Sequence, residues 1–281
     1  MAKQKKTPVA LARRAALRGE AGEALSVLLQ SASAGDASAA ASAAELLAYL
    51  DRWPEVIAHA GALIANPFAV YAGNVFDDMV RLLARAARET GRWGEVEAVA
   101  VNARRQVSSA LDANAMNFPD VKVQVTRKRL LTIIGALTDY AHSADGDGFL
   151  DLTQIFGVAV EPPDRANYDA AIAAKKNQPA DRRFALAVVF KIDDEVARIF
   201  PELKVPVGFD KAVAFARIMA KNGAHEAAWT AIETSWPQWA PVDHAQLAPV
   251  ELLTDPLLAP ILTTARRASL IKTPRAVHLT G

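Results

Sequence analysis

A loop rich in aspartate and glycine holds the densest set of potential ligand side chains in this sequence. It runs from Ser143 to Gln154, and Ser143, Asp145 and Asp147 supply oxygen atoms at its first, third and fifth positions. Gly148 follows at the sixth position, where the chain of a calcium loop turns sharply. Alternate residues can direct their oxygens into one concavity, which is the arrangement that a hard cation requires.

This loop resembles an EF-hand calcium loop, with two departures. Ser143 stands where that family has aspartate, and Gln154 stands where it has the glutamate that supplies two ligand oxygens. We therefore expect no calcium binding tighter than about 1 mM, and a calcium-responsive regulator is a minor alternative. The other interpretation is a turn between helices, in which glycine tolerates positive φ and aspartate caps the backbone.

His142 stands immediately before this loop, at the expected end of a helix. Its imidazole could serve as a general base beside Asp145 and Asp147, which would make the middle of the chain an enzyme site. It could also be structural, because a cation is favoured at a helix C-terminus. The other histidines lack the HExxH spacing, so the sequence predicts no zinc helix.

Other signatures of catalysis and cofactor binding are missing from the sequence. There is no GxxxxGKS/T phosphate loop, no GxGxxG motif after a strand and no GxSxG nucleophile elbow. There is no cysteine, which excludes disulfides, thiolate nucleophiles, iron–sulfur clusters and cysteine zinc sites. We expect neither a cofactor nor a metal.

Composition favours a soluble helical protein. Alanine supplies much of the 52% hydrophobic content and aromatic residues only 7%, which favours closely packed helices. With 32 basic and 31 acidic residues the formal charge is +1, so we expect no nucleic-acid or membrane partner. Arg13 and Arg14 interrupt the apolar stretch that a signal peptide would need, and no apolar run is long enough to span a membrane. We expect a cytoplasmic protein.

Part of the sequence repeats itself. The segments Leu50–Val56 and Thr90–Val96 share Arg, Trp, Glu and Val at matching positions. Shorter copies of the same template, a turn followed by Glu and a small residue, occur at Gly19–Ala24 and Asn222–Ala227. Recurrence of this kind indicates a stack of similar structural units.

At these positions the sequence resembles the tetratricopeptide repeat, a helix–turn–helix unit of about 34 residues. A small residue (Ala12, Ala44 or Ala84) precedes three of the turns by the same spacing, and Trp53 and Trp93 occupy the aromatic position of the turn. The resemblance covers roughly residues 8 to 106 and 208 to 235 and implies helix pairs stacked into a superhelix. The spacing is irregular, so a generic helix-pair solenoid is the alternative.

Further helices are expected along the rest of the chain. The predicted spans are Val121–Ala141, Asp169–Lys176, Pro179–Phe200 and Lys211–Lys221, the last capped by Asp210. From Ser235 onward repeated prolines break any long helix. We interpret this last region as an irregular cap over the end of the helical array, because a terminal repeat has an apolar face to cover.

The sequence therefore predicts an all-α fold, a helix-pair (tetratricopeptide-like) solenoid with an irregular proline-rich C-terminal cap. We divide the chain into N-terminal repeats (1–107), a further helical region that includes the Asp/Gly loop (108–234) and the cap (235–281).

A helical array of this kind favours a non-catalytic protein-binding module, such as an adaptor, chaperone or inhibitor, with a protein or peptide as its partner. A bacterial immunity protein that neutralises a toxin is one alternative, and an enzyme centred on His142, Asp145 and Asp147 is another. The first helix of each pair commonly lines the inner face of such arrays, which nominates these partner-binding residues: Arg14, Tyr49, Arg81, Arg85 and Arg88.

Overall fold

The computed structural model describes residues 7–66, 75–114, 121–142, 150, 162–175 and 177–276. Across these ranges the regular elements are helices, and no β-strand occurs among them. The prediction of an all-α fold is confirmed. The helices of the first half are α1 (Pro8–Leu17), α2 (Ala21–Ser33), α3 (Ala37–Tyr49), α4 (Trp53–Ala65), α6 (Val75–Thr90), α7 (Trp93–Asn114) and α8 (Val121–His142).

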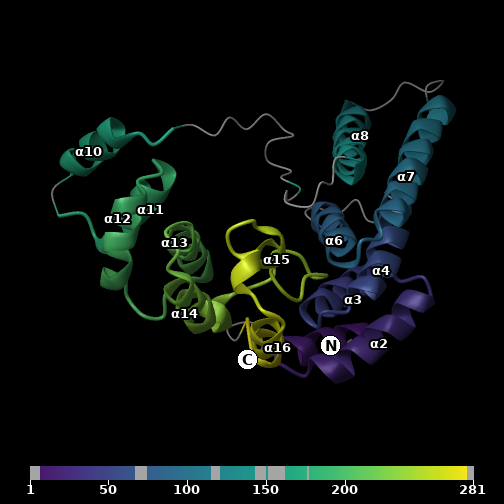
Figure 1. Cartoon of the computed structure of the whole chain (residues 1–281), viewed down its shortest axis with the longest axis horizontal. Coiled ribbons are helices and arrows are strands. Elements are labelled where there is room, and N and C mark those ends of the chain that lie inside the picture. Colours follow the sequence, from purple (N-terminus) through teal and green to yellow (C-terminus); the bar gives the residue numbers. More distant parts are fainter. Residues whose placement is uncertain are drawn as a thin grey trace, which may run out of the picture.

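The second half contains shorter elements. They are α10 (Arg165–Ala173), α11 (Ala180–Val189), α12 (Asp193–Ile199), α13 (Phe209–Lys221), α14 (His225–Ser235), α15 (Glu251–Thr254) and α16 (Thr264–Lys272), with the 3₁₀ helices η1 (Phe200–Glu202), η2 (Trp236–Gln238) and η3 (Ala259–Ile261). Neighbours in sequence pack on one another: α1 on α2, α2 on α3, α3 on α4, α4 on α6, α7 on α8 and α13 on α14 (Figure 1).

The four repeated segments share a local conformation. Gly19, Asp51 and Gly91 stand at matching places in the template, and Gly223 lies one place later in the fourth copy; all four have φ between 63° and 92°. This left-handed conformation ends one helix and turns the chain into the next. The ion pairs after two of the turns also correspond, because the arginine that precedes each template tryptophan binds the glutamate three residues further on. The repeat found in the sequence is therefore a repeat in structure at its turns.

Helix α3 explains the abundance of alanine. Every side chain from Ala39 to Tyr49 is buried, and α3 contacts α2, α4, α6 and α16. Small side chains let these neighbours approach closely on several sides of one helix. The same burial encloses two polar residues of α3, Ser42 and Glu45, which must find partners inside the protein.

The prediction of a single helix from Pro179 to Phe200 is wrong. It is divided into α11 and α12 by a turn at Lys191, which has a φ of 58°. The turn buries Ile192 in a small core with Phe184 and Val196. Three acidic residues open α12, where the positive end of the helix dipole favours them.

Two other predicted helix starts need correction. The predicted span Asp169–Lys176 is instead α10, which begins at Arg165 because the carboxylate of Asp164 accepts the backbone N–H of Asn167 at 3.0 Å. Helix α13 begins at Phe209, with Gly208 in the cap position and no side-chain cap. Asp210 therefore lies in the first turn of α13, so its carboxylate does not cap the helix.

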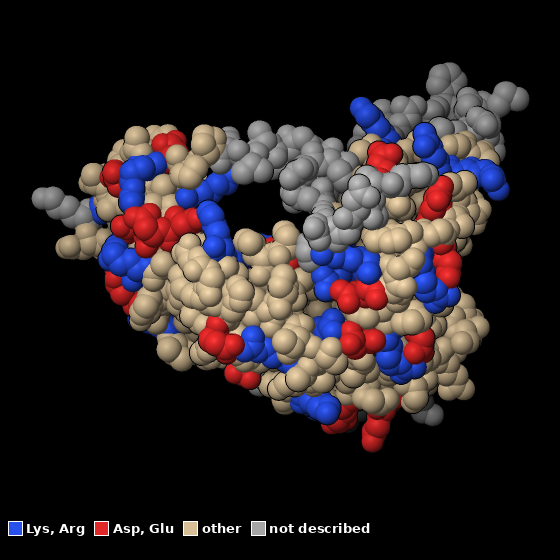
Figure 2. Space-filling view, in the orientation of Figure 1, with Lys and Arg blue, Asp and Glu red and all other residues tan. Residues whose placement is uncertain are grey.

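The C-terminal region packs between the two halves of the chain. Residues 236–276 form short helical and irregular segments, drawn in yellow in Figure 1, between the α3 and α6 helices and the α13–α14 pair. Their apolar side chains join the main core together with residues of α1 to α8, α13 and α14. On the face shown in Figure 2, lysine and arginine side chains are interspersed with aspartate and glutamate. Within the described ranges, no helix combines the length and apolarity needed to cross a membrane.

Candidate cationic-ligand cleft

The residues predicted to contact a partner are spread over α1, α3 and α6. Arg14 is exposed on α1. Tyr49 on α3 is fully buried, and its hydroxyl donates to the carbonyl oxygen of Pro249 at 2.9 Å. In this arrangement Tyr49 offers no surface to a second chain, because the protein's own C-terminal region covers it.

The three predicted arginines of α6 have different surroundings. Arg85 is half-buried, with its guanidinium 2.5 Å from the carboxylate of Glu89 and 6.0 Å from the ring centre of Trp53. Arg88 is also half-buried on the same helix. Only Arg81 of the predicted set reaches the cleft described below.

Residues 239–250, which we call the C-terminal strap, run from η2 to α15 and are held by side chains of α3. Ser42, Glu45 and Tyr49 lie three and four residues apart, so they share one face of the helix. Their bonds to the strap are Ser42 Oγ to the Ala245 carbonyl (2.6 Å), Tyr49 Oη to the Pro249 carbonyl (2.9 Å), and Glu45 Oε2 from the N–H groups of Leu247 (2.5 Å) and Ala248 (3.1 Å).

The Leu247 peptide is bound on both sides by buried ionisable groups. Arg275 donates from Nε to the Leu247 carbonyl, opposite the carboxylate of Glu45. Burial raises the pKa of Glu45 well above its usual range and lowers that of Arg275 to about 10. These contacts are made to backbone atoms, so they fix the path of the strap. They therefore also fix the strap's side of the cleft described next.

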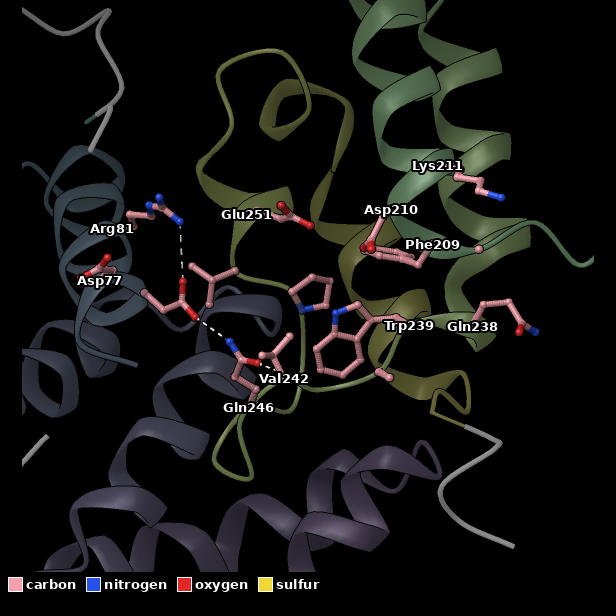
Figure 3. Close-up of a pocket in the computed structure, with 15 residues that line it drawn as sticks. Asp77, Arg81, Phe209, Asp210, Lys211, Gln238, Trp239, Val242, Gln246 and Glu251 are labelled. Atoms are coloured by element: carbon pink, nitrogen blue, oxygen red, sulfur yellow. Dashed lines mark hydrogen bonds and ion pairs between the residues drawn. The ribbon is translucent and has the colours of Figure 1, made fainter. Parts of the chain in front are cut away.

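The strap forms the floor of a cleft of about 760 Å³ (Figure 3). Helix α6 supplies one wall, the first turn of α13 supplies the opposite wall, and α15 contributes Glu251. Phe209 and Trp239 contribute aromatic rings to the lining, and Val242 lies at the surface with 85% exposure. A cleft of this size is within the range of ligand-binding sites.

Carboxylates outnumber cations in the lining of the cleft. Asp77, Asp78, Asp210 and Glu251 face only Arg81 and Lys211. The ammonium group of Lys211 binds Asp181, which is not part of the lining, and Figure 3 shows its side chain pointing away from Glu251.

Two of the four carboxylates already have strong partners. Asp77 is paired with Arg129 of α8. Asp78 accepts a hydrogen bond of 2.9 Å from the amide of Gln246 and lies 3.8 Å from Arg81.

The other two carboxylates are free of such contacts. The carboxylate oxygens of Asp210 and Glu251 make no hydrogen bond or ion pair with any residue that the structure describes. Arg217, whose charge acts on Glu251, is itself bound to Asp255 at 2.5 Å. Burial raises the pKa of Asp78 to about 6, and burial likewise raises the pKa of Glu251. The cleft therefore has unused capacity to accept hydrogen bonds from a positively charged group.

The ionisable side chains of the described lining are of few kinds. They are carboxylates, one arginine and one lysine, and the lining includes no serine, threonine or histidine. Among the described residues no group of three or more His, Asp or Glu side chains is arranged to hold a metal ion.

The loop that the sequence singled out lies mostly outside the described residues. This applies to Asp145, Asp147 and the other positions of Ser143–Gln154 apart from Leu150. His142 is the last residue of α8, and its side chain is likewise outside the described part. The hypotheses of a calcium loop and of an enzyme site there stay predictions.

Sequence reasoning did not identify the carboxylates of the cleft. Asp78, Asp210 and Glu251 come from three segments that are far apart in the chain, so no local spacing connects them. One signal was available: Asp78 interrupts the apolar face of α6 and Glu45 interrupts that of α3, and buried acids in such places require partners. In comparisons with known proteins, no family model matches the chain, and neither a curated protein nor a solved structure does.

Proposed function

We propose that this protein is a non-catalytic binding module that holds a segment of a partner polypeptide in the cleft between α6, α13 and the C-terminal strap. The observation that carries the proposal is the cleft itself, with its surplus of unpaired carboxylates and its lack of hydroxyl and imidazole groups. A binding protein needs complementary groups in a fixed concavity and needs no nucleophile.

The architecture supports this proposal. The turns of the four repeated segments share one conformation, which favours a helix-pair solenoid of the tetratricopeptide type with the proline-rich C-terminal region as its cover. Such arrays commonly hold polypeptides on an extended surface. Here the strap already occupies the face of α3 that includes Tyr49, so we place the partner in the adjacent cleft, where Arg81 remains a contact residue.

A bulky substitution at the mouth of the cleft tests the proposal. Val242 lines the cleft and is 85% exposed, so Val242→Trp should obstruct it without disturbing the core. Val189→Trp is the matched control, because Val189 is 69% exposed on α11 and is not part of the lining.

The experiment compares tagged parent and variant proteins purified from the native host. We expect one polypeptide to accompany the parent and Val189→Trp in a fixed ratio and to be lost from Val242→Trp. A polypeptide that stays with Val242→Trp would exclude the cleft as its site. Purification of the parent with no polypeptide at all would contradict the binding function.

A further inference from the structure

The cleft combines a charge imbalance with an incompletely satisfied buried carboxylate. Asp78 is largely buried, with 11% of its side chain exposed. Its Oδ2 accepts the amide of Gln246 at 2.9 Å, but its Oδ1 lies 3.8 Å from Arg81, which is too far for a hydrogen bond. The oxygen without a partner belongs to the neighbouring Asp77, whose Oδ1 is buried and accepts no hydrogen bond from any described residue, while its Oδ2 pairs with Arg129. A carboxylate oxygen that has left water without gaining a donor is costly, and a donor that reached it from the cleft would remove that cost.

The two carboxylates without a side-chain partner come from other elements of the lining. Burial raises the pKa of Glu251 on α15, and the charge of Asp210 on α13 adds to that rise, while the positive charges of Arg217 and Arg81 oppose it. Of the two cations in the described lining, Lys211 binds Asp181 outside the cleft, and Arg81 lies 3.8 Å from Asp78 and also acts on Glu251. One further positive charge would bring the three acids Asp78, Asp210 and Glu251 closer to charge balance with Arg81.

We propose that the cleft recognises an arginine side chain, presented by an extended basic segment of the partner polypeptide. This inference rests on the proposed function, since it names the chemical class of the partner segment. The ligand must donate several hydrogen bonds to carboxylates on separate walls, and a guanidinium group carries five N–H donors in one plane. An ammonium group is a compact point charge that can satisfy fewer such acceptors at once.

Two features of the lining favour guanidinium over other cations. Phe209 and Trp239 pack against Trp236 and are 4% and 7% exposed, so they give the lining an apolar side against which the methylene stem of arginine can pack. The described carboxylates are not gathered as the ligands of a metal ion would be. The acceptors come from three separate elements, α6, α13 and α15, and a guanidinium can donate in several directions within its plane.

Labelled peptides test the inference on the full-length protein. The probe is a short glycine–serine peptide with adjacent arginines at its centre. Three matched peptides have lysine, neutral citrulline or glutamate in their place, and binding is followed by fluorescence anisotropy at low and at physiological ionic strength. We expect the arginine peptide to bind best, the lysine peptide several-fold more weakly and the other two not at all.

Substitutions within the cleft locate the binding. Glu251→Gln and Asp210→Asn each remove one free carboxylate at constant size and should weaken the arginine peptide about tenfold. Glu233→Gln is the control, because it makes the same change of charge at an exposed residue of α14 that is not part of the lining. It should leave the affinity unchanged, and thermal melts of all three variants establish that they are folded.

The outcomes separate this inference from the proposed function. Equal binding of arginine and citrulline peptides, or binding that neither Glu251→Gln nor Asp210→Asn weakens, would overturn the arginine site. If the arginine peptide does not bind, but a polypeptide purifies with the parent and not with Val242→Trp, the arginine site is refuted and the proposed function stands. If the arginine peptide binds and the substitutions in the cleft weaken it, but no polypeptide purifies with the parent, the arginine site stands and the polypeptide partner is refuted.

Discussion

The hydroxyl of Tyr49 donates a hydrogen bond of 2.9 Å to the carbonyl oxygen of Pro249, joining α3 to the strap across two hundred residues of sequence. Both residues are buried, and the ring of Tyr49 also packs 5.9 Å from that of Trp236. Arg275 extends the junction, because its backbone N–H donates to the carbonyl of Leu17 at 2.9 Å. The last part of the chain is therefore bound to the first part by hydrogen bonds inside the core.

The hydrogen bond from Tyr49 should add little to the free energy of unfolding. Its main effect should be to hold the strap in place. In Tyr49→Phe the carbonyl of Pro249 keeps a backbone bond of 3.3 Å from Leu252, so it is not left unsatisfied. We expect a loss of about 1 kcal/mol in the free energy of unfolding. Hydrogen exchange of the strap amides should accelerate, measured by mass spectrometry.

Tyr168→Phe is the control for this prediction. It removes a hydroxyl that hydrogen-bonds Glu195 at 3.2 Å, at a site outside the main core. Exchange in the strap should not respond to it. Equal acceleration in both variants would mean that the bond between Tyr49 and Pro249 does not hold the strap.

The two tryptophans of the repeat should differ in their contribution to stability. Trp53 is 4% exposed, and the guanidinium groups of Arg267 and Arg85 lie 5.4 and 6.0 Å from the centre of its ring. Trp93 is only half-buried, and its ring meets that of Tyr140 edge to face at 5.5 Å. The same sequence position is therefore embedded in one repeat and near the surface in the other.

We expect Trp53→Ala to lower the free energy of unfolding by about 3–5 kcal/mol, because it opens a cavity in the core. Trp93→Ala should lower it by about 1–2 kcal/mol. Chemical denaturation of the two variants measures both values. Equal losses would contradict the different environments of the two rings.

Local sequence patterns predicted where helices form better than they predicted what those helices pack against. The repeated turns could be found from the sequence because a left-handed residue, an Arg–Glu pair and a following helix are determined within a few residues. The division of residues 179–200 was missed because the turn at Lys191 depends on burying Ile192 in a core that its neighbours build. Tertiary packing decided that boundary, and propensity did not.

The site was harder to predict for the same reason. Helical phase placed Tyr49 on the inner face of the array, but no pattern indicated that the strap would cover it. The acids of the cleft meet only after α6, α13 and α15 are assembled, so their spacing in the sequence contains no trace of the site. Arg81 was nominated as one of a row of arginines, and the structure instead places it among carboxylates.

Asp78 should make stability depend on pH. Burial raises its pKa from 3.8 to about 6, so in that interval the folded protein binds a proton that the unfolded chain has released. The free energy of unfolding therefore contains a contribution that is complete below about pH 4 and is lost as the pH rises through about 6. Above that range the folded protein holds a desolvated negative charge.

Asp78→Asn removes this charge and keeps an oxygen for the amide of Gln246. We expect the variant to exceed the parent in stability by about 1–3 kcal/mol at neutral pH, and the difference to vanish below about pH 4. Denaturation of both proteins across this pH range measures it. Glu45 contributes to the slope in both proteins, because burial raises its pKa as well, so the difference between the two curves isolates Asp78.

An exposed carboxylate provides the control for this last prediction. Asp169→Asn changes the net charge by the same amount at the surface of α10, so its stability should run parallel to that of the parent at every pH. A difference between Asp78→Asn and the parent that stays constant with pH would mean that Asp78 is ionised equally in the folded and unfolded chains. The carboxylate of Asp78 would then gain as much from the groups around it as it loses by burial, and the cleft would hold no unsatisfied charge there.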